Sequence, residues 1–414
     1  MCDSRFKHTL GKTARILAVS SFVLAAVVLH PSYQTVQFKS GFSSPVTSRY
    51  NVQPSQTHIY REESSFATNL NAKSKDYTPC LSALSARPRA LVTGVSGMIG
   101  SYVVKQLIHE GKYEVHGLVR YRSDLSNLAG ELNNIQLVRG DILDGTRVKQ
   151  VVAEICPTVI FHFAAQAING VSYDSAELTL DTNIKGTFNM LEAVRFAGLS
   201  NKTRFLLAGS STEYGKTADT WEGAIPEEAP LAPVSPYGVS KVAADLLAQQ
   251  YVHSHGMHVV TARFFIQVSA GGTESLAPQE FCRQIAMIEL GLQSPVVRHG
   301  RITTKRDITD LRDSARVVTK LVDLGEPGQS YNIGSGIALS MKDILDTAIS
   351  LSTRPDITTL FDGARERLYD EKILLSDNRK IRELTGWIPD PNITNTIADI
   401  LKHWRRKTRT LFPE

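Results

Sequence analysis

Three side chains in the middle of the chain could together move a proton to or from an oxygen atom. Tyr237 and Lys241 stand four residues apart in the segment SPYGVSK, a spacing that places them on one face of a helix. A tyrosine is a useful proton donor to a carbonyl only where its phenolate is stabilised, and a nearby ammonium group does this by lowering the tyrosine pKa. Ser210, in the segment GSSTEYG, can hydrogen-bond the same oxygen. The residue types and their order predict a catalytic set of Ser210, Tyr237 and Lys241.

The segment RALVTGVSGMIG has the spacing of a loop that binds a dinucleotide. An apolar strand is expected before its glycines, and a helix over 98–110 after them. Gly94 permits a tight turn, Gly97 lets the backbone approach a pyrophosphate, and Gly100 lets helix and strand pack closely. The N-terminus of the helix then presents free N–H groups to the phosphates. The predicted cofactor contacts in this loop are Thr93, Gly94, Gly97, Met98, Ile99 and Gly100.

The end of the second predicted strand, 114–119, indicates which dinucleotide binds. An acidic residue at this place would bind the ribose hydroxyls of NAD. The chain instead has Arg120, Arg122 and Ser123, which suit a 2′-phosphate. The sequence therefore predicts NADP, with NAD as the alternative.

Strands and helices alternate with short connections, a pattern typical of a doubly wound parallel sheet of the Rossmann type. Ligands of such sheets lie beyond the carboxyl ends of the strands. Further cofactor contacts are therefore expected after the strands 135–139 and 158–163, at Asp141, Ile142, Ala164 and Ala165. We expect an α/β fold with a Rossmann domain over 88–270 and a smaller substrate-binding lobe over 271–414, part of which returns to the sheet.

From about residue 89 to residue 403 the chain resembles an extended short-chain dehydrogenase/reductase. The matching motifs are TGxxGxxG, HFAAQ, DTNIKGT, SPYGVSK, RDITDLRD and YNIGSG. Within that family it most resembles the branch of GDP-mannose 4,6-dehydratases and GDP-4-keto-6-deoxy-mannose reductases, and residues 281–313 look more like the reductases. The resemblance implies a nucleoside-diphosphate sugar as substrate, hydride exchange at sugar C4 and a homodimer. It also implies substrate contacts from Gln166, Asn183, Ser211, Thr212, Glu213, Arg306 and Arg367.

Two positions depart from the pattern of that branch. Its dehydratases place a glutamate, which removes the C5 proton, two residues before a Tyr-Gly pair, where this chain has Thr212. Glu213 comes one residue later, and in an extended stretch a one-residue shift turns a side chain to the opposite face. Ile266 stands where the branch has a substrate-contacting asparagine. We therefore expect 4-keto reduction first, then 4,6-dehydration, then 4-epimerisation. A non-catalytic scaffold that senses NADP is the alternative from another class.

The first 87 residues differ from the rest of the chain. Basic residues precede an apolar run over 16–29, which is short for a membrane span but suits a signal peptide or an uncleaved signal anchor. We expect 1–30 to be an anchor or targeting segment and 31–87 a flexible stem or transit segment. This predicts membrane anchoring with a lumenal catalytic domain, or an organelle reached by a cleaved presequence, over a cytoplasmic enzyme.

Composition excludes several other classes of protein. The net charge is +5, and the basic residues near the C-terminus lack the interleaved aromatic residues of a nucleic-acid site. The four cysteines contain no CxxC pair, so we expect neither a disulfide framework nor a metal site. Cys156, just before an apolar strand, is expected to be a buried thiol.

Overall fold

The computed structural model describes residue 80 and residues 87–366, 369–390 and 392–412, all of which belong to one compact unit. The predicted anchor over 1–30, and the predicted stem apart from Cys80 and Arg87, lie outside the described residues. Within the described part of the chain, no helix combines the length and apolar character that crossing a membrane requires.

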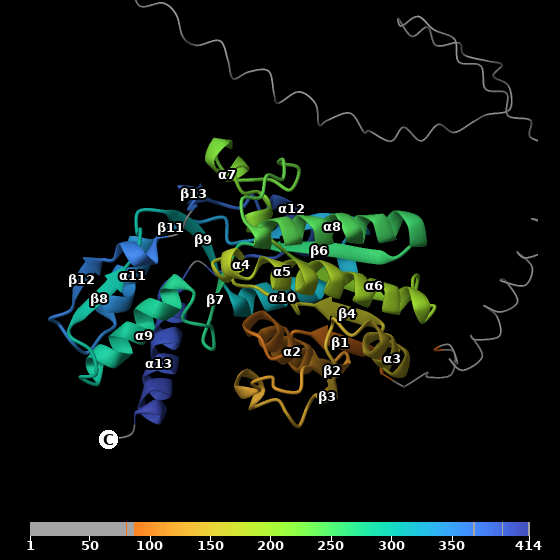
Figure 1. The fold of residues 1–414 in the computed structure, drawn as a ribbon, viewed down its shortest axis with the longest axis horizontal. Coiled ribbons are helices and arrows are strands. Elements are labelled where there is room, and N and C mark those ends of the chain that lie inside the picture. Colours follow the sequence, from red (N-terminus) through yellow and green to blue (C-terminus); the bar gives the residue numbers. More distant parts are fainter. Residues whose placement is uncertain (1–79, 81–86, 367–368, 391, 413–414) are drawn as a thin grey trace, which may run out of the picture. The chain divides into compact units, whose positions relative to one another are not determined.

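A parallel sheet of seven strands forms the centre of this unit, in the order β10-β6-β5-β4-β1-β2-β3 (Figure 1). Apart from the edge strand β3, the strands are almost entirely buried because helices cover both faces, as expected for parallel sheets. The chain reverses direction of winding between β1 and β4, so a crevice opens at their carboxyl ends. This confirms the predicted Rossmann-type sheet. Its strands are β1 (Arg89–Thr93), β2 (Glu114–Val119), β3 (Gln136–Arg139), β4 (Val159–His162), β5 (Arg204–Ser210), β6 (His258–Phe264) and β10 (Ser330–Ile333).

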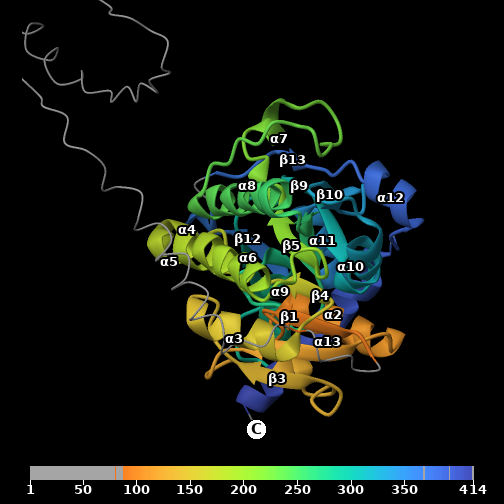
Figure 2. The same ribbon diagram turned by 90° about the vertical axis from the view of Figure 1, so that its right-hand side faces the viewer.

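Two apolar clusters, one on each face, hold the helices against the sheet (Figures 1 and 2). One cluster includes α2 (Met98–Glu110) and α10 (Leu311–Leu324). The other includes α3 (Gly145–Ile155), α6 (Gly186–Phe196) and α8 (Pro236–His255). The shorter helices are α4 (Val171–Asp174), α5 (Ala176–Leu180), α7 (Thr217–Thr220) and α12 (Arg379–Thr385).

Most of the remaining chain builds a smaller lobe with a core of its own. Three helices, α9 (Ala277–Glu289), α11 (Met341–Ser350) and α13 (Ile393–Leu411), pack beside short strands (Figure 1). The strands β7, β9, β11 and β13 form one sheet, and β8 pairs with β12. Their bounds are β7 (Ile266–Val268), β8 (Val296–His299), β9 (Lys305–Asp310), β11 (Ala338–Ser340), β12 (Thr358–Phe361) and β13 (Ile373–Leu374).

The cysteines correct one prediction. Cys156 is not a buried thiol, because it forms a disulfide with Cys80. Cys156 caps the C-terminus of α3 in the left-handed conformation, with φ of 48°, and is only half-buried there. Cys80 lies at this helix end, and the distance between the two Cα atoms is 5.7 Å. A sequence separation of 76 residues gave no local signal of the pair.

Candidate active site

The glycine loop has the geometry that its spacing predicts. Gly94 has φ of 65°, and a Cβ atom there would lie 2.6 Å from the amide nitrogen of Ala164 at the end of β4. A Cβ atom on Gly100 would lie 2.3 Å from the carbonyl oxygen of Gly94, so only glycine allows α2 to approach β1 this closely. Gly97 stands directly before α2, and no side chain of a described residue caps the N-terminus of this helix. The first N–H groups of α2 are therefore available to an anion.

Thr93 and Ala164 contribute to the shape of the cofactor site through their packing. The Thr93 hydroxyl contacts Nδ1 of His162 at 2.7 Å and accepts the N–H of Ala164 at 3.2 Å. Complete burial lowers the pKa of His162 to about 3, so this ring is neutral. The strand ends of β1 and β4 are thereby tied together beside the small residues Ala164 and Ala165.

Arginine side chains surround the carboxyl end of β2. Arg120 and Arg122 are exposed, and the hydroxyl of Ser123 accepts the Arg120 N–H at 3.1 Å. Arg139, at the end of the neighbouring strand β3, stacks 4.9 Å from the ring centroid of Tyr121 and donates to the Tyr121 carbonyl oxygen. Sequence reasoning missed Arg139. The register of β2 with β3, which pairs Val119 with Arg139, is what brings it here.

Asp141 and Ile142 follow β3, as predicted. The Asp141 carboxylate accepts the N–H of Leu143 at 2.9 Å, which closes the turn into α3. Ile142 is buried against Gly186, where a Cβ atom would lie 2.4 Å from its side chain. Both residues shape this end of the sheet, and their contact with a cofactor remains a prediction.

The structure brings the predicted catalytic set together. Ser210 ends β5, while Tyr237 and Lys241 lie on the first turns of α8, and all three are at least nine-tenths buried. Ser235 caps α8 by accepting the N–H of Gly238, and Pro236 occupies the first helical position. The Lys241 Nζ atom donates to the carbonyl oxygen of Ala208 at 2.8 Å and lies 5.7 Å from the centroid of the Tyr237 ring.

Burial is the largest influence on the pKa values of Tyr237 and Lys241. It raises the pKa of Tyr237 to about 12, and a hydrogen bond with Ser210 acts against this rise. Burial also lowers the pKa of Lys241 to about 8, while the Glu213 carboxylate acts in the opposite direction. The tyrosine is therefore a protonated acid at neutral pH, and the lysine is an ammonium close to its titration point.

The turn after β5 points the side chains of Thr212 and Glu213 in different directions. The Thr212 hydroxyl donates to the Oγ of Ser210 at 2.9 Å, so this residue faces the catalytic set. Glu213 is completely buried and forms an ion pair with Arg263 at 3.0 Å. Glu213 was expected among the substrate contacts, but its side chain points into the interior because the turn reverses it relative to Thr212. Ser211, between Ser210 and Thr212, is also buried.

Gln166 and Asn183 hold each other rather than facing open space. The Asn183 amide accepts the Gln166 N–H at 2.8 Å and donates to the Gln166 carbonyl and to the Ser240 hydroxyl. The Gln166 side chain bonds to Thr179 and to the backbone of Ile168. Asn183 lies in a π-helical turn, Asp181–Lys185, a distortion that often marks functional sites. The side-chain amides of both residues are therefore already used by neighbouring groups, and their contact with a substrate remains a prediction.

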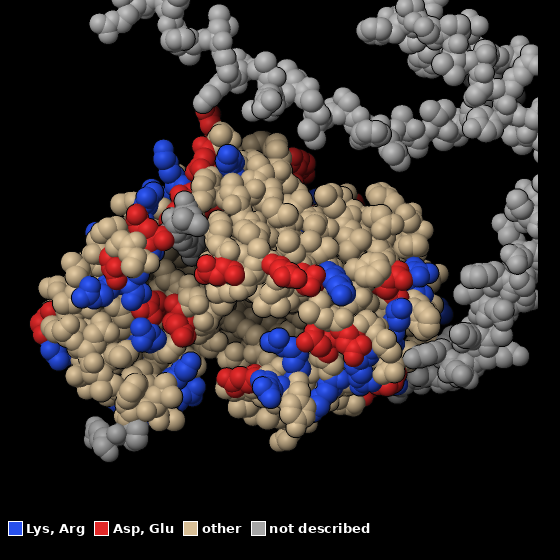
Figure 3. Space-filling view, in the orientation of Figure 1, with Lys and Arg blue, Asp and Glu red and all other residues tan. Residues whose placement is uncertain are grey.

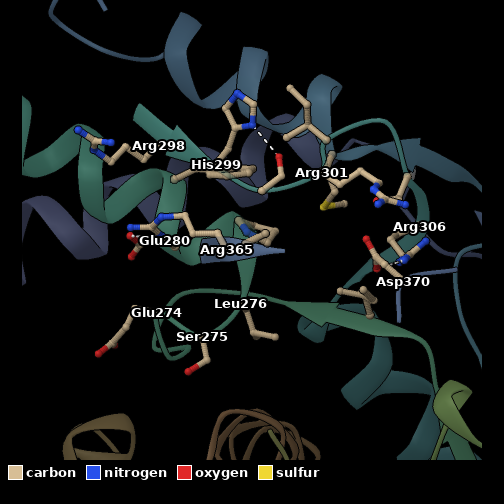
Figure 4. Close-up of a pocket in the computed structure, with 18 residues that line it drawn as sticks. Glu274, Ser275, Leu276, Glu280, Arg298, His299, Arg301, Arg306, Arg365 and Asp370 are labelled. Carbon is tan, nitrogen blue, oxygen red and sulfur yellow. Dashed lines mark hydrogen bonds and ion pairs between the residues drawn. The ribbon is translucent and has the colours of Figure 1, made fainter. Parts of the chain in front are cut away.

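A second part of the site is a cavity of about 290 Å³ in the smaller lobe. Four arginines line it, and Figure 4 shows them around the opening: Arg298, Arg301, Arg306 and Arg365. The surface in Figure 3 is hollowed between the part that carries α9 and the part that carries α2. Ile266, at the position of the expected asparagine, adds to an apolar wall with Leu276 and Phe281.

The arginines of this cavity differ in their contacts. Arg306 is buried and donates to the carboxylate of Asp370 at 2.5 Å and to the carbonyl oxygen of Glu371 at 2.7 Å. Arg365 pairs with Glu280 at 3.0 Å, whereas exposed Arg298 has no ion pair with any described residue. Arg306 therefore lines the cavity but already pairs with a carboxylate, and its contact with a substrate remains a prediction. Arg367 lies outside the described residues.

Comparison with known proteins places this architecture in a family. The description of the family whose profile matches residues 91–400 is GDP-mannose 4,6 dehydratase. The GDP-mannose 4,6-dehydratase of Vibrio cholerae is 28% identical over 350 residues, which cover 75% of this chain and 92% of that protein. The GDP-6-deoxy-D-mannose reductase of Pseudomonas aeruginosa is 29% identical over 273 residues, which cover 66% of this chain and 88% of that protein.

A solved structure shows the same architecture. RMD from Pseudomonas aeruginosa, complexed with NADPH, superposes with a TM-score of 0.66 at 26% sequence identity. The superposition covers 77% of this chain and 99% of that one.

The comparisons also correct the predicted location. The family match begins at residue 91, so the predicted anchor over 1–30 has no counterpart in it. The part of the chain that the structure describes adds no membrane-spanning helix, and the apolar run over 16–29 lies outside that part. We therefore withdraw the predictions of a lumenal, membrane-anchored enzyme and of an organelle-targeted one.

The fold, the Ser–Tyr–Lys arrangement and the family match agree over more than 300 residues. The match covers the glycine loop, the catalytic set and the cavity of the smaller lobe. The chain belongs to the GDP-mannose 4,6 dehydratase family of extended short-chain dehydrogenase/reductase enzymes.

Proposed function

We propose that this enzyme is an NADP-dependent 4-keto reductase of a nucleoside-diphosphate sugar of the GDP-4-keto-6-deoxy-mannose type. The observation that carries this choice is the turn after β5. A dehydratase of this family needs a carboxylate at the position of Thr212, and the nearest candidate, Glu213, is buried and paired with Arg263. A reductase needs no base at C5. The relatives include both a reductase and dehydratases, so the choice rests on this turn, while the NADPH-bound structure supports NADP as the cofactor.

The residues present fit a phosphorylated dinucleotide. Gly94, Gly97 and Gly100 leave the N-terminus of α2 open to a pyrophosphate, because a Cβ atom at Gly94 or Gly100 would fill the turn. Exposed Arg120 and Arg122, with Arg139 beside them, provide charge-assisted donors for a 2′-phosphate. NADPH, when bound, supplies the hydride that reaches C4 of the sugar.

The protein's own part of the reaction is to hold and protonate the C4 oxygen. Tyr237 donates its phenolic proton to that oxygen as the carbonyl becomes an alcohol. The ammonium of Lys241 favours the phenolate that remains, and the Ser210 hydroxyl hydrogen-bonds the same oxygen. Burial of all three groups strengthens these interactions because little water competes with them.

The cavity of the smaller lobe suits the diphosphate of the substrate. A doubly charged group needs cationic donors, and Arg298 is the arginine there that forms no ion pair with a described residue. Arg306 and Arg365 stand beside it with carboxylate partners of their own. We propose that Arg298 makes the first contact with the diphosphate and that the paired arginines complete the site.

The test is a direct comparison of substrates. Purified protein is incubated with NADPH and GDP-4-keto-6-deoxy-mannose, and the oxidation of NADPH is followed by absorbance. The proposal requires NADPH consumption and a deoxy-sugar alcohol as product. Absence of NADPH consumption together with water loss from GDP-mannose, with the cofactor recycled, would make the protein a dehydratase. Interconversion of C4 epimers without net NADPH use would make it an epimerase.

We also propose that the enzyme is a homodimer that pairs through α5 and α6, which follow one another end to end, and through α8, which lies beside them in Figures 1 and 2. Large apolar side chains of these helices are more than two-fifths exposed: Leu178, Phe188, Val239 and Leu246. Contiguous exposed apolar side chains of this kind mark protein interfaces. Analytical ultracentrifugation of the wild type and of Leu246→Glu should show a dimer and a monomer, respectively. A monomeric wild type would contradict this proposal.

A further inference from the structure

A buried acid lies directly behind the proposed catalytic set. We propose that Glu213 is a positioning residue, which fixes the backbone of Ser210 by a hydrogen bond and keeps Lys241 in its ammonium form by charge. The inference rests on the proposed function, because it concerns the residues that would protonate the substrate there. It assigns a part in the reaction to a residue whose side chain does not reach the substrate site.

The first step of the argument is the contact with Ser210. The Glu213 carboxylate accepts the N–H of Ser210 at 2.7 Å, while Ser210 caps the short helix Ser211–Glu213. The Ser210 Oγ accepts from the N–H and from the hydroxyl of Thr212. With its acceptor positions used in this way, the Ser210 hydroxyl directs its own proton outward, toward Tyr237 or a substrate oxygen. Glu213 and Thr212 therefore act on Ser210 from two sides.

The second step is the space that the chain leaves for this carboxylate. A Cβ atom on Gly209 would lie 2.7 Å from Oε1 of Glu213 and 2.9 Å from the side chain of Thr261. Any other residue at 209 would displace the carboxylate from the Ser210 amide. Gly209, the residue before the end of β5, thus makes room for the acid.

The third step is the balance of charge in the interior. Glu213 faces Arg263 from β6, Asp245 and Lys241 from α8, and the tyrosines Tyr214 and Tyr237. Arg263 pairs with Glu213 at 3.0 Å and with Asp245 at 2.7 Å. Burial and the neighbouring Asp245 raise the pKa of Glu213 to about 7, while Arg263 and Lys241 act against this rise. The Glu213 carboxylate is therefore charged above about pH 7, the range in which Lys241 titrates, and an isolated ammonium at Lys241 would be costly there without it.

The two acids of this cluster differ in what they reach. Asp245 accepts hydrogen bonds from Thr261 and Ser330 in addition to Arg263, and no hydrogen bond or ion pair among the described residues joins it to Ser210 or Lys241. Glu213 is the carboxylate that raises the pKa of Lys241 against the effect of burial. Asp245 is therefore a matched control, because its loss removes a buried charge from Arg263 without touching Ser210 or Lys241.

The sign of the effect follows from these contacts. Removing the Glu213 charge removes an influence that raises the pKa of Lys241, so that pKa falls below its value of about 8. The ammonium form is then lost at lower pH, and turnover that needs it is lost at lower pH as well. Asparagine at 245 leaves that influence in place.

The experiment compares Glu213→Gln with Asp245→Asn in the full chain with NADPH bound. The Cε signal of Lys241, identified as the one absent from Lys241→Met, is titrated by NMR on protein that contains isotope-labelled lysine. We expect the midpoint to fall by about one pH unit in Glu213→Gln and to stay in place in Asp245→Asn. The alkaline limb of kcat should move with it. Equal midpoints in the wild type and Glu213→Gln would overturn the inference, whatever the two variants do to the Tm.

A second variant covers the contact with Ser210. Glu213→Asp keeps a negative charge next to Arg263, but its side chain is one methylene shorter, so the carboxylate moves away from the Ser210 N–H. We expect an unchanged Lys241 midpoint and a kcat reduced by about tenfold. A kcat in Glu213→Asp equal to that of the wild type would contradict the proposal that Glu213 positions Ser210. Because the NMR midpoint needs no turnover, it still decides the case for Glu213 if the protein fails to reduce a 4-keto sugar.

Discussion

Tyr237 is the residue on which the proposed proton transfer depends most directly. Tyr237 is buried, its hydroxyl interacts with Ser210, and Nζ of Lys241 lies 5.7 Å from the centroid of its ring. We expect Tyr237→Phe to lower kcat by about 100-fold to 10,000-fold, the range typical of a lost general acid. The measurement is NADPH oxidation at saturating substrate.

The control for this variant is the binding of NADPH, followed by its fluorescence. Phenylalanine keeps the ring and its packing, so the Kd for NADPH should stay within about threefold of the wild type. Turnover equal to that of the wild type would show that another group protonates the substrate.

The arginines at the end of β2 should decide between NADPH and NADH. Arg120→Ser with Arg122→Ser removes two exposed donors from the proposed 2′-phosphate site. We expect the KM for NADPH to rise roughly tenfold or more, because a hydrogen bond to a charged group contributes about 1.5 kcal/mol or more. The KM for NADH should change little, and higher salt should narrow the difference between the cofactors. An equal loss for both cofactors would mean that the arginines support the loop and do not read the phosphate.

The place of some of these residues in the site could be predicted from the sequence, and that of others could not. Tyr237 and Lys241 share a helix, so a local spacing predicts their contact. Glu213 appeared to be a displaced substrate residue, because the direction of its side chain depends on the turn after β5 and on Arg263 from a distant strand. The disulfide partner of Cys156 depends on the path of a segment 76 residues away, which no local pattern reports.

At the scale of elements, the predicted and observed ends of helices agree most closely where a capping residue ends the helix. The predicted helix 98–110 is observed as Met98–Glu110, because Gly111 ends it in the left-handed conformation. In the last helix, α13, the buried apolar residues end at Trp404, whereas the helix continues to Leu411. Its final turns carry mostly polar residues, so the apolar period stops before the helix does. Periodicity reports the buried face of a helix and not its full length.

The glycines of α2 provide a test at this scale. Gly100→Ala would place a Cβ atom 2.3 Å from the backbone of Gly94, which must move and take the loop with it. We expect at least a tenfold weaker affinity for NADPH and a lower Tm, because the backbone that approaches the pyrophosphate is displaced. Calorimetry and a fluorescence titration measure the two effects.

The matched control lies at the other end of the same helix. Gly111 also has positive φ, 64°, but a Cβ atom there meets nothing within 4 Å. Asparagine tolerates this conformation, so Gly111→Asn should keep the NADPH affinity of the wild type. If both variants weakened the binding of NADPH alike, close packing at Gly100 would not be the cause.

At the scale of the whole molecule, the parallel sheet could be derived from the sequence and the substrate cavity could not. Each strand of the sheet carries its own apolar pattern and is followed by a helix, so local signals add up to the topology. The cavity combines side chains from 266 to 370, contributed by loops, two sheets and the helices α9 and α11, and its walls exist only once the smaller lobe has folded. Motif resemblance located Arg306 in it, whereas Arg298 and Arg365 became visible only in the structure.

The bridge between Cys80 and Cys156 belongs to this scale, because it closes a loop of 76 residues that contains β1 to α3. Cross-linking a loop of that length restricts the unfolded chain and stabilises the fold by about 4 kcal/mol in the chain-entropy description. We expect a reducing agent to lower the Tm of the wild type by several degrees, and the Cys156→Ser variant to show the lower Tm with or without the reducing agent.

Cys282→Ala is the control, since Cys282 is a buried free thiol and its variant keeps the bridge. Its Tm should still fall on reduction. A wild-type Tm that does not respond to the reducing agent would mean that the two cysteines are not joined in solution. The half of the sheet proposed to bind NADPH would then be held by its apolar core alone.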